Sequence, residues 1–369
     1  MKLGKVSRPC FALSCVAPVQ AIRGLGSRSC RSTLAFQSLT ASKNRRRDFL
    51  NRFSSSLDMT TGLIDVDCNL WHKDLKTLQN KELNVPDTWN ILKEDAIEAS
   101  KIVSVLSPSS TIKEAENGLK TLRNNPPPLP VRTTVGVHPY HVNDDEFVGK
   151  SLEEHRDYIK ELIETHSDFC AAVGECGLDT SDGFPPLEDQ LPWFRLQVRI
   201  AEDLDLPLFI HERLAFDETM DILKDTTVPV IIHCFTGTKD QCIEYIKRGY
   251  FVSVSGYILK ESNDNYAEVI SCLTDGVIPM DKLMIETDAP YMGFKNCRKL
   301  YVDHNEEFVS TLNSKKRKRL MNSIYPNVPS SLPMVLDRVL ECLQRNDASL
   351  TREQVAAKTT ENAKQFFGF

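Results

Sequence analysis

Eight short apolar runs alternate along this chain with amphipathic segments, and this alternation limits the folds that the chain can adopt. The runs are rich in β-branched residues and are bounded by turn-forming residues. They cover residues 62–67, 101–107, 131–137, 169–175, 206–211, 228–234, 250–255 and 282–287. Such runs are typical of strands buried on both faces of a parallel sheet and joined by right-handed crossovers. Eight βα units predict an α/β fold, a closed (β/α)8 TIM barrel rather than an open sheet.

The segments between the apolar runs have the periodicity of amphipathic helices. They include Leu152–His166, Leu187–Leu204, Asp217–Lys224, Lys239–Lys247 and Asn263–Leu273. The chain contains no Gly-x-Gly-x-x-Gly motif and no Walker loop, which disfavours dinucleotide-binding and NTPase folds. Four prolines within Asn124–Pro130 predict a rigid loop before the third strand.

A polar segment, residues 295–330, follows the last predicted strand and predicts an insertion in the barrel domain. It carries the basic run Lys315-Lys316-Arg317-Lys318-Arg319. Basic runs of this kind are most often solvated loops, and a solvated loop is the prediction here. The alternatives are a nuclear address and a contact with nucleic acid.

Four of the apolar runs have a residue that can bind a metal ion at their C-terminal end or directly beside it. These residues are Glu175, His211, His233 and Asp288. In a (β/α)8 barrel the site lies at the C-terminal ends of the strands, where the inward-facing residues converge. Two imidazoles and two carboxylates around one centre predict a divalent-metal site.

The N-terminal segment, residues 1–58, has the composition of a targeting sequence. The first 47 residues contain no Asp or Glu, ten Lys or Arg, and many Ser. This composition predicts a mitochondrial transit peptide, with a plastid address as an alternative. The apolar run Phe11–Ile22 also allows a bipartite signal with a secretory region, and a disordered basic tail is the remaining alternative. A start at Met59 would give a cytoplasmic or nuclear form that consists of the barrel domain, residues 59–369.

The barrel domain is acidic once the N-terminal segment is set aside. Residues 1–58 hold 11 of the 45 basic and 2 of the 51 acidic residues, so 34 and 49 remain, a net charge of −15. A domain with this charge does not hold nucleic acid by global attraction. A phosphate substrate would need local features such as metal ions and a few basic side chains.

The 11 cysteines form no CxxC pair and no zinc-finger spacing. Their odd number and their scatter through apolar runs predict reduced thiols in a reducing compartment. No stretch approaches the roughly 20 apolar residues of a membrane span.

Five motifs, in order along the chain, make it resemble the TatD family of metal-dependent deoxyribonucleases, which belongs to the amidohydrolase-like barrels. The motifs are Gly136–Pro139, Gly174–Asp179, His211–Ala215, His233–Gly237 and Glu286–Tyr291. The resemblance covers roughly residues 60–369 and implies a TIM barrel of the metal-dependent hydrolase type.

The resemblance also implies roles for the strand-end residues. Glu175 corresponds to the carboxylate that holds or bridges the metals, and His211 and His233 correspond to the imidazole ligands. Asp288 corresponds to an aspartate that binds metal and accepts a proton from the attacking water. His138 is expected to contact the scissile phosphate as part of the catalytic group, or else to be a structural histidine beside Pro139.

Arg213 is a further expected contact of the substrate phosphate, because a guanidinium group suits bidentate binding of phosphate. A surface ion pair is the alternative reading of Arg213.

The chain departs from the family at the first strand, where many members carry His-x-His. Here the two positions are Asp67 and Asn69, which are two apart on a strand and therefore face the same side. Asp67 is expected to bind metal, and Asn69 to offer a carbonyl oxygen to metal or substrate. Oxygen ligands favour Mg²⁺ or Mn²⁺ over Zn²⁺ in a site for one or two ions. Two further departures, Asn327-Val328-Pro329 without its acid and Lys295 in place of Arg, bear on substrate choice.

The family implies a deoxyribonuclease, and more specifically a 3′→5′ exonuclease that hydrolyses phosphodiester bonds of DNA and prefers single strands. The substrate partner is then the 3′ end of DNA, with RNA or tRNA as an alternative. Two other functions remain open on the same scaffold. One is the hydrolysis of an amide or ester such as aminoacyl-tRNA, and the other is binding without catalysis. The sequence does not specify an oligomeric state.

Overall fold

The computed structural model describes residues 62–76, 78, 89–92 and 95–369. The predicted targeting segment, residues 1–58, and the alternative start Met59 lie outside this part of the chain. None of the helices described has the length and apolar character needed to cross a membrane.

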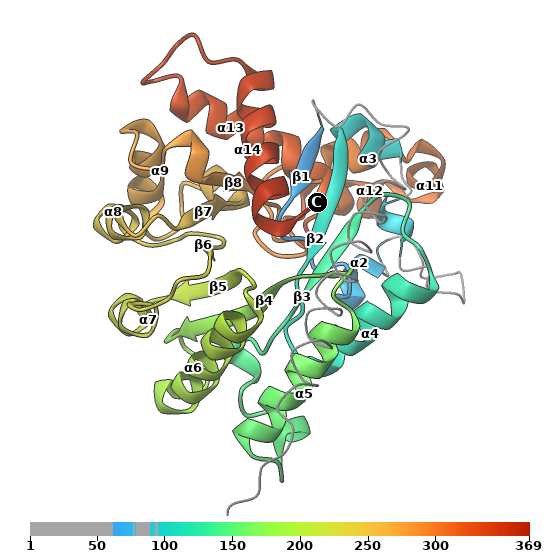
Figure 1. The fold of residues 1–369 in the computed structure, drawn as a ribbon. Coiled ribbons are helices and arrows are strands. Elements are labelled where there is room, and N and C mark those ends of the chain that lie inside the picture. Colours follow the sequence, from blue (N-terminus) through green and yellow to red (C-terminus); the bar gives the residue numbers. More distant parts are fainter. Residues whose placement is uncertain (1–61, 77, 79–88, 93–94) are drawn as a thin grey trace, which may run out of the picture. The chain divides into compact units, whose positions relative to one another are not determined.

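Eight parallel strands form one sheet in chain order, which confirms the predicted (β/α)8 barrel (Figure 1). The strands are β1 (Leu63–Asp65), β2 (Ile102–Ser107), β3 (Val131–Val135), β4 (Cys170–Asp179), β5 (Leu208–Arg213), β6 (Val230–Ile232), β7 (Phe251–Val254) and β8 (Leu283–Ile285). Backbone hydrogen bonds join the last strand to the first, from Val66 N to Ile285 O at 3.3 Å and from Asp288 N to Asp67 O at 2.8 Å. These bonds close the barrel just beyond the ends of β1 and β8.

Two strands continue beyond their predicted ends. The apolar runs predicted ends at Glu175 and His211, but β4 continues to Asp179 and β5 to Arg213. The polar ends pair with each other, from Gly177 opposite His211 to Asp179 opposite Arg213. Backbone pairing rather than hydrophobicity sets the end of each strand. The lengths predicted from the apolar runs were therefore too short for these two strands.

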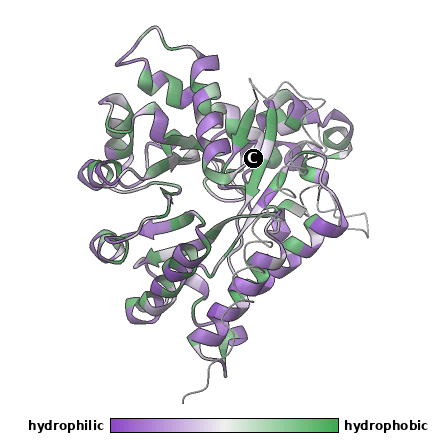
Figure 2. Ribbon diagram, in the orientation of Figure 1, coloured by the Kyte–Doolittle hydropathy of each residue, from purple (hydrophilic) through white to green (hydrophobic). Residues whose placement is uncertain are grey.

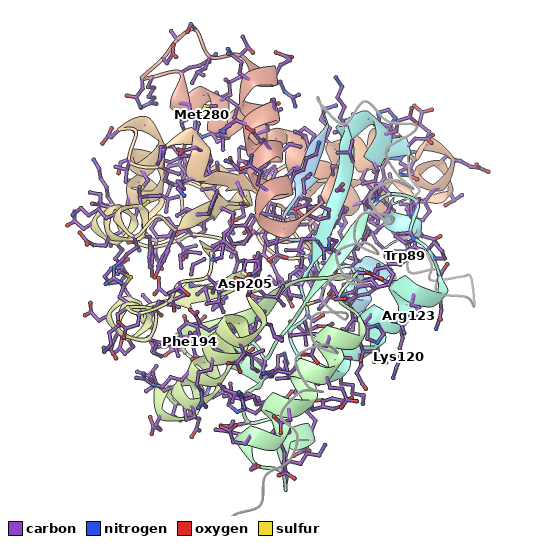
Figure 3. All side chains as sticks on the ribbon, in the orientation of Figure 1. Trp89, Lys120, Arg123, Phe194, Asp205 and Met280 are labelled. Carbon is purple, nitrogen blue, oxygen red and sulfur yellow. The ribbon has the colours of Figure 1, made fainter. Side chains whose placement is uncertain are left out.

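Helices connect the strands, and the five predicted helices are all present. The α-helices are α2 (Lys73–Lys76), α3 (Asp95–Ser100), α4 (Ile112–Asn124), α5 (Leu152–Thr165), α6 (Leu187–Leu204), α7 (Phe216–Ile222), α8 (Lys239–Lys247), α9 (Tyr266–Thr274), α10 (Lys299–Asp303), α11 (Glu306–Thr311), α12 (Ser314–Asn322), α13 (Leu332–Leu343) and α14 (Arg352–Phe367). The longer helices α4, α5 and α6 are amphipathic, with buried apolar residues on one side and charged residues on the other. Phe194 of α6 is buried, whereas Lys120 of α4 is exposed (Figure 3).

The basic run within the polar segment 295–330 lies on a helix rather than in a loop, and this corrects its prediction. Lys315 and the four basic residues after it lie on α12 and are exposed. Lys and Arg have good helix propensity, and the Asn313 side chain caps the helix by accepting a hydrogen bond from Lys316 N. The expected solvent exposure is therefore present, but on an ordered helix.

Apolar side chains pack on both sides of the strands, against the outer helices and inside the barrel. In Figure 2 strands β1 and β2 are mainly green, whereas α4 and α5 alternate between purple and green. Inside the barrel, strand residues such as Ile64 and Phe209 pack with Phe367 of α14. Arg132 of β3 is buried there and donates hydrogen bonds to the carbonyl oxygens of Phe367, Gly368 (3.0 Å) and Cys170 (2.7 Å). These bonds fix the end of α14 to the barrel. The C-terminal ends of the strands are left open for a site.

Candidate active site

A cavity of about 640 Å³ lies at the C-terminal ends of the strands. Its lining comes from strand ends and from the loops that follow them, as in other barrels of this architecture. Seven of the eight predicted site residues line it, namely Asn69, His138, Glu175, His211, Arg213, His233 and Asp288. The eighth, Asp67, is fully buried and does not line the cavity.

The position of Glu175 depends on two glycines in β4. Pairing of β4 with β5 skips one residue of β4 between Val173 and Cys176, so β4 contains a bulge at Glu175. Gly174 and Gly177 flank this bulge with φ values of +149° and +142°. A Cβ on Gly177 would lie 1.8 Å from the His211 carbonyl oxygen. Only glycine permits this approach of the two backbones.

Replacement of Gly177 by alanine is expected to lower the free energy of unfolding by about 3 kcal/mol, because β4 and β5 must separate. The matched control is Gly183→Ala, since Gly183 also has positive φ (+91°) but nothing lies within 4 Å of an added Cβ. Urea unfolding of both variants separates crowding from backbone strain. Equal losses in the two variants would contradict the close approach of the strands.

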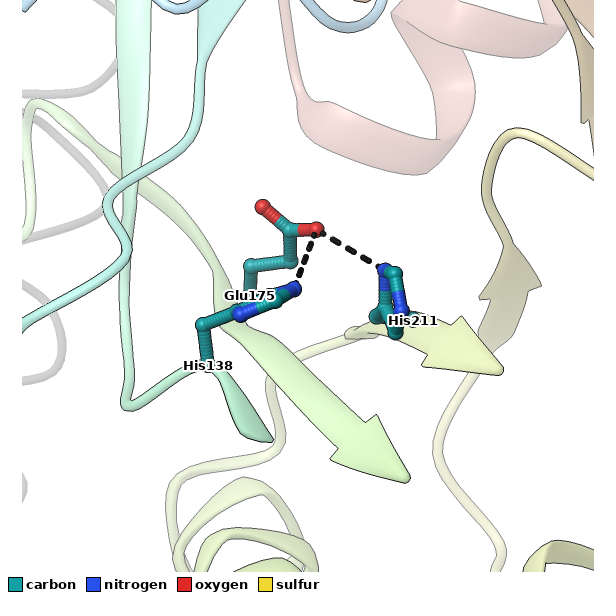
Figure 4. Close-up of side chains that lie close together, drawn as sticks. All are labelled: His138, Glu175 and His211. Atoms are coloured by element: carbon teal, nitrogen blue, oxygen red, sulfur yellow. Dashed lines mark ion pairs between the residues drawn. The ribbon is translucent and has the colours of Figure 1, made fainter. Parts of the chain in front are cut away.

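One oxygen of Glu175 is the centre of the site (Figure 4). Glu175 Oε1 lies 3.5 Å from His138 Nε2, 3.4 Å from His211 Nδ1 and 2.8 Å from His233 Nε2. The three imidazoles come from the loop after β3, from β5 and from the end of β6. The barrel therefore brings together residues that lie up to 95 positions apart in the chain, from 138 to 233.

The other nitrogen of each histidine has its own partner, and these partners indicate how each ring is oriented. His211 Nε2 lies 2.8 Å from Asp179 Oδ2, which leaves Nδ1 facing Glu175. His233 Nδ1 lies 3.1 Å from Asp67 Oδ2, which leaves Nε2 facing Glu175. A carboxylate behind an imidazole is the usual support of a metal-binding histidine.

His138 is oriented differently from the other two histidines. Its Nδ1 accepts a hydrogen bond from Tyr140 N at 3.2 Å, so the ring proton belongs on Nε2. Burial lowers the pKa of His138 to about 3, which keeps the ring neutral. His138 therefore offers an N–H donor to the cavity rather than a lone pair.

Carboxylates crowd the floor beneath the cavity. Asp67, Glu286 and Asp288 lie around His233, and Asn69 Nδ2 is 3.2 Å from Asp67 Oδ1 and 3.5 Å from Asp288 Oδ1. Asp67 and Asn69 thus lie side by side, as their spacing predicts, although only Asn69 lines the cavity. Asp67 lies behind His233 because the chain beyond β1 pairs with residues 288–289 and turns its side chain inward.

Burial and the neighbouring charges shift the pKa values of Asp288, Asp67 and His233. Burial, together with the charges of Glu286 and Glu175, raises the pKa of Asp288 to about 8. Burial raises the pKa of Asp67 well above its usual range as well. Although burial lowers the pKa of His233, the negative charge of Glu175 raises it well above its ordinary value. Without a cation, this cluster retains protons that the same groups would lose in water.

These residues fit a divalent cation. Both ring nitrogens of His233, Glu286 Oε1 and Asp67 Oδ2 are buried without a well-aligned hydrogen bond among the described residues. Buried polar atoms without partners are uncommon, and a bound ion is one of the usual reasons. Two groups of side chains lie close enough together to surround an ion: Glu175 and His211, with the N–H of His138 beside them, and Asp67, His233 and Glu286.

Two of the residues in this arrangement were not predicted. Asp179 supports His211, and Glu286 is fully buried and accepts a 2.6 Å hydrogen bond from Ser253 Oγ. Each had a signal in the sequence. Glu286 precedes Asp288 by two residues, and Asp179 follows two glycines in an apolar run. Only strand pairing shows where these side chains point, that of β4 with β5 for Asp179 and that of β8 with β7 for Glu286.

The barrel, the cavity at its C-terminal face and the clustered histidines and carboxylates define a barrel hydrolase with a candidate metal centre. The family described as TatD related DNase matches residues 64–368. This chain therefore belongs to the TatD related DNase family and is a hydrolase.

Two relatives and one solved structure illustrate the similarity. The 3′-5′ ssDNA/RNA exonuclease TatD of Escherichia coli is 32% identical over 239 residues, which are 64% of this chain and 77% of that protein. The protein of the same name from Escherichia fergusonii is 29% identical over 73% of this chain and 89% of its own length. The TatD family hydrolase from Entamoeba histolytica shares the fold, with a TM-score of 0.64 at 20% identity over 83% of this chain and 98% of that one.

Proposed function

We propose that this protein is a metal-dependent 3′→5′ exonuclease that hydrolyses phosphodiester bonds of single-stranded DNA. The observation that carries the proposal is the convergence of three imidazoles on Glu175 Oε1 at the base of the cavity, in a chain of the TatD related DNase family. Direction and strand preference rest on the names of the two bacterial relatives, which also include RNA. A cavity of about 640 Å³ suits a strand end better than a continuous duplex.

The residues proposed to hold the cation are Glu175, His211, His233 and Asp288, with Asp67 behind His233. A bound divalent ion would lower the pKa of a water molecule and offset the charge of the phosphate. Two imidazoles alone would suit Zn²⁺, but Asp67, Asp288 and Asn69 provide oxygen at the first and last strands. We therefore propose Mg²⁺ or Mn²⁺, as one or two ions.

The chain's own groups complete the proposed reaction. Asp288 accepts the proton of the attacking water. Glu175 orients the three imidazoles that converge on its Oε1 atom. His138, neutral and with its proton on Nε2, donates a hydrogen bond to a phosphate oxygen. Arg213 lies exposed at the rim of the cavity, where its guanidinium group can reach a phosphate, and it forms no ion pair with another described residue.

The double change His211→Ala, His233→Ala tests the metal site. We expect at least about a thousandfold lower kcat/KM on single-stranded DNA, since two ligands are lost together. Metal content after dialysis, measured by elemental analysis, should fall in parallel. The control is His304→Ala, because His304 lies at the end of α10, outside the cavity lining. Unchanged metal content in the double variant would show that the ion binds elsewhere.

We also propose that residues 1–58 direct the protein to the mitochondrion, because the first 47 residues are basic and free of acids. A fluorescent fusion to residues 1–58 should enter mitochondria. Diffuse fluorescence in the cytosol would rule out this address, and accumulation in plastids would support the alternative.

A further inference from the structure

Exposed apolar side chains gather around the cavity. Among the described residues, the large hydrophobic side chains with high exposure are Tyr140, Val148, Tyr158, Leu214, Tyr291, Ile324 and Tyr325. Tyr140 and Tyr291 line the cavity, and Leu214 follows Arg213, which also lines it. Clustering of exposed apolar groups at one place indicates a binding surface, whereas isolated ones are ordinary.

Tyr291 and Tyr325 form one side of this rim. Their ring centroids lie 6.3 Å apart, and Tyr291 also packs edge-on against His72 at 5.6 Å. Tyr325 is held from the other side by a 2.6 Å hydrogen bond from its hydroxyl to Asp74 Oδ2. Even so, 47% of Tyr291 and 43% of Tyr325 remain exposed. Two supported but exposed rings at the mouth of a cavity can stack on nucleobases.

Helix α12 leads directly into this aromatic pair. It ends at Asn322, three residues before Tyr325, and Arg298 Nη2 holds the connecting segment by a 2.7 Å hydrogen bond to Ser323 O. Helix α10 contacts both α12 and α3, so the segment that contains α12 packs on the barrel. A fully extended segment of three residues spans about 10 Å, so the C-terminal end of the basic helix lies close to the rim.

Helix α12 is an unusually uniform source of positive charge in an acidic domain. Residues 311–325 contain five Lys or Arg and no Asp or Glu. All five basic side chains are exposed, and none forms an ion pair with another described residue. Many other surface cations are paired, as Lys120 is with Glu116 and Lys247 with Glu244. The charge of α12 is thus available to an external anion.

The opposite side of the rim has the opposite charge. There Tyr140 packs against Phe184 at 5.3 Å, and the segments that carry them, 139–149 and 180–194, contain six Asp or Glu and no Lys or Arg. His141 of this side is paired with Asp144 at 2.8 Å. A phosphate backbone that leaves the cavity is repelled on this side and attracted toward α12.

We propose that Tyr291, Tyr325 and helix α12 form a track for the part of the single strand upstream of the scissile bond. In this track the two rings stack on bases, and Lys315, Lys316 and Lys318 contact phosphates. The inference rests on the proposed function, because the track binds the same nucleic acid whose 3′ end enters the cavity. It also explains how an acidic domain can retain a long polyanion.

The charge test uses the full-length protein with Lys315→Gln, Lys316→Gln and Lys318→Gln combined. Binding of a fluorescent DNA strand of about 20 nucleotides is measured in EDTA over a range of salt concentrations. Loss of three phosphate contacts should reduce the slope of log K against log salt by about 2 for a single strand. The matched control removes three charges elsewhere, at Lys120, Lys224 and Lys247. Lys120 and Lys247 lie near the C-terminal ends of α4 and α8, and Lys224 follows the C-terminal end of α7, on the side of the barrel away from the C-terminal ends of the strands.

The stacking test replaces Tyr325 by leucine and by phenylalanine. Tyr325→Leu should weaken strand binding about tenfold, and Tyr325→Phe should restore most of it, because the ring is retained and only the bond to Asp74 is lost. Tyr158→Leu, an exposed tyrosine on α5, is the control.

Activity then separates this inference from the proposed function. With Mg²⁺ or Mn²⁺, the ratio of kcat/KM for the long strand to that for a trinucleotide should fall about tenfold in the α12 variant, mainly through KM. If α12 and control variants behave alike, the track is wrong while the nuclease proposal stands. If the unmodified protein hydrolyses neither substrate, the proposed function fails and the track fails with it. Loss of nuclear entry in cells, with unchanged DNA binding, would instead make α12 an import signal.

Discussion

Replacement of Glu175 by glutamine is expected to lower kcat/KM on single-stranded DNA by about a thousandfold, or about 4 kcal/mol of transition-state stabilisation. Glutamine keeps the shape of the side chain but removes the charge. Glu175 Oε1 is the atom on which His138, His211 and His233 converge. Loss of its charge removes the anion that attracts a cation and orients the imidazoles. The expected loss of rate is therefore at least as large as that caused by removing one hydrogen-bond donor from an active site.

The control for this change is Glu212→Gln, which is another buried glutamate beside the cavity. Glu212 accepts hydrogen bonds from Ala215 N at 3.0 Å and from the Tyr245 hydroxyl at 2.9 Å, so it faces the wall and not the imidazoles. We expect it to retain activity within about tenfold of the unmodified protein. Similar kinetics for the two variants, with metal still bound in both, would remove Glu175 from the centre of the site.

The second large effect is a loss of stability of the metal-free protein as the pH rises from 6 to 9. In the unfolded chain Asp288 loses its proton near pH 4, whereas in the fold its pKa is about 8. Between about pH 4 and pH 8 the folded state therefore binds more protons than the unfolded chain. The free energy of unfolding falls in this range by up to about 1.4 kcal/mol per pH unit. The raised pKa values of His211 and His233 act in the same direction above pH 6.5.

Scanning calorimetry in EDTA measures this effect as a melting temperature about 5 °C or more lower at pH 9 than at pH 6. Mn²⁺ at a hundred times its Kd should add about 2.7 kcal/mol of stability. Asp288→Asn should flatten the pH dependence in EDTA and abolish most of the effect of Mn²⁺, because asparagine carries no charge at any pH. Identical melting curves with and without metal at pH 9 would contradict the assignment of the buried carboxylates to a cation site.

The sequence predicted the barrel because eight mainly apolar runs alternate with amphipathic segments, and few other folds accommodate such a pattern. It also predicted seven residues of the cavity lining, since strand ends of a barrel share one face. It was wrong about the ends of β4 and β5, where pairing carries polar residues into the sheet. A bulge in β4 cannot be recognised from hydrophobicity, although the glycines on both sides of Glu175 indicate unusual backbone geometry.

The orientation of side chains was the harder part of the site to predict. Asp67 and Asn69 were expected to face the same side, and their side chains are in contact, but only Asn69 lines the cavity, because backbone pairing beyond β1 buries Asp67 behind His233. Asp179 and Glu286 act through a histidine or a hydroxyl, and such supporting contacts depend on neighbouring strands in the barrel. The basic run was predicted as a loop because its charge was considered without the Asn313 cap.

The most direct test of the central claim is the digestion of single-stranded DNA by the full-length protein. Two substrates, labelled at the 5′ or at the 3′ end, are each incubated with Mg²⁺, with Mn²⁺ and with EDTA, beside Asp288→Ala. The account predicts metal-dependent stepwise shortening of the 5′-labelled strand and immediate release of the 3′ label, both lost in EDTA and in the variant. No shortening by folded, metal-loaded protein, or shortening that persists in Asp288→Ala, would contradict it.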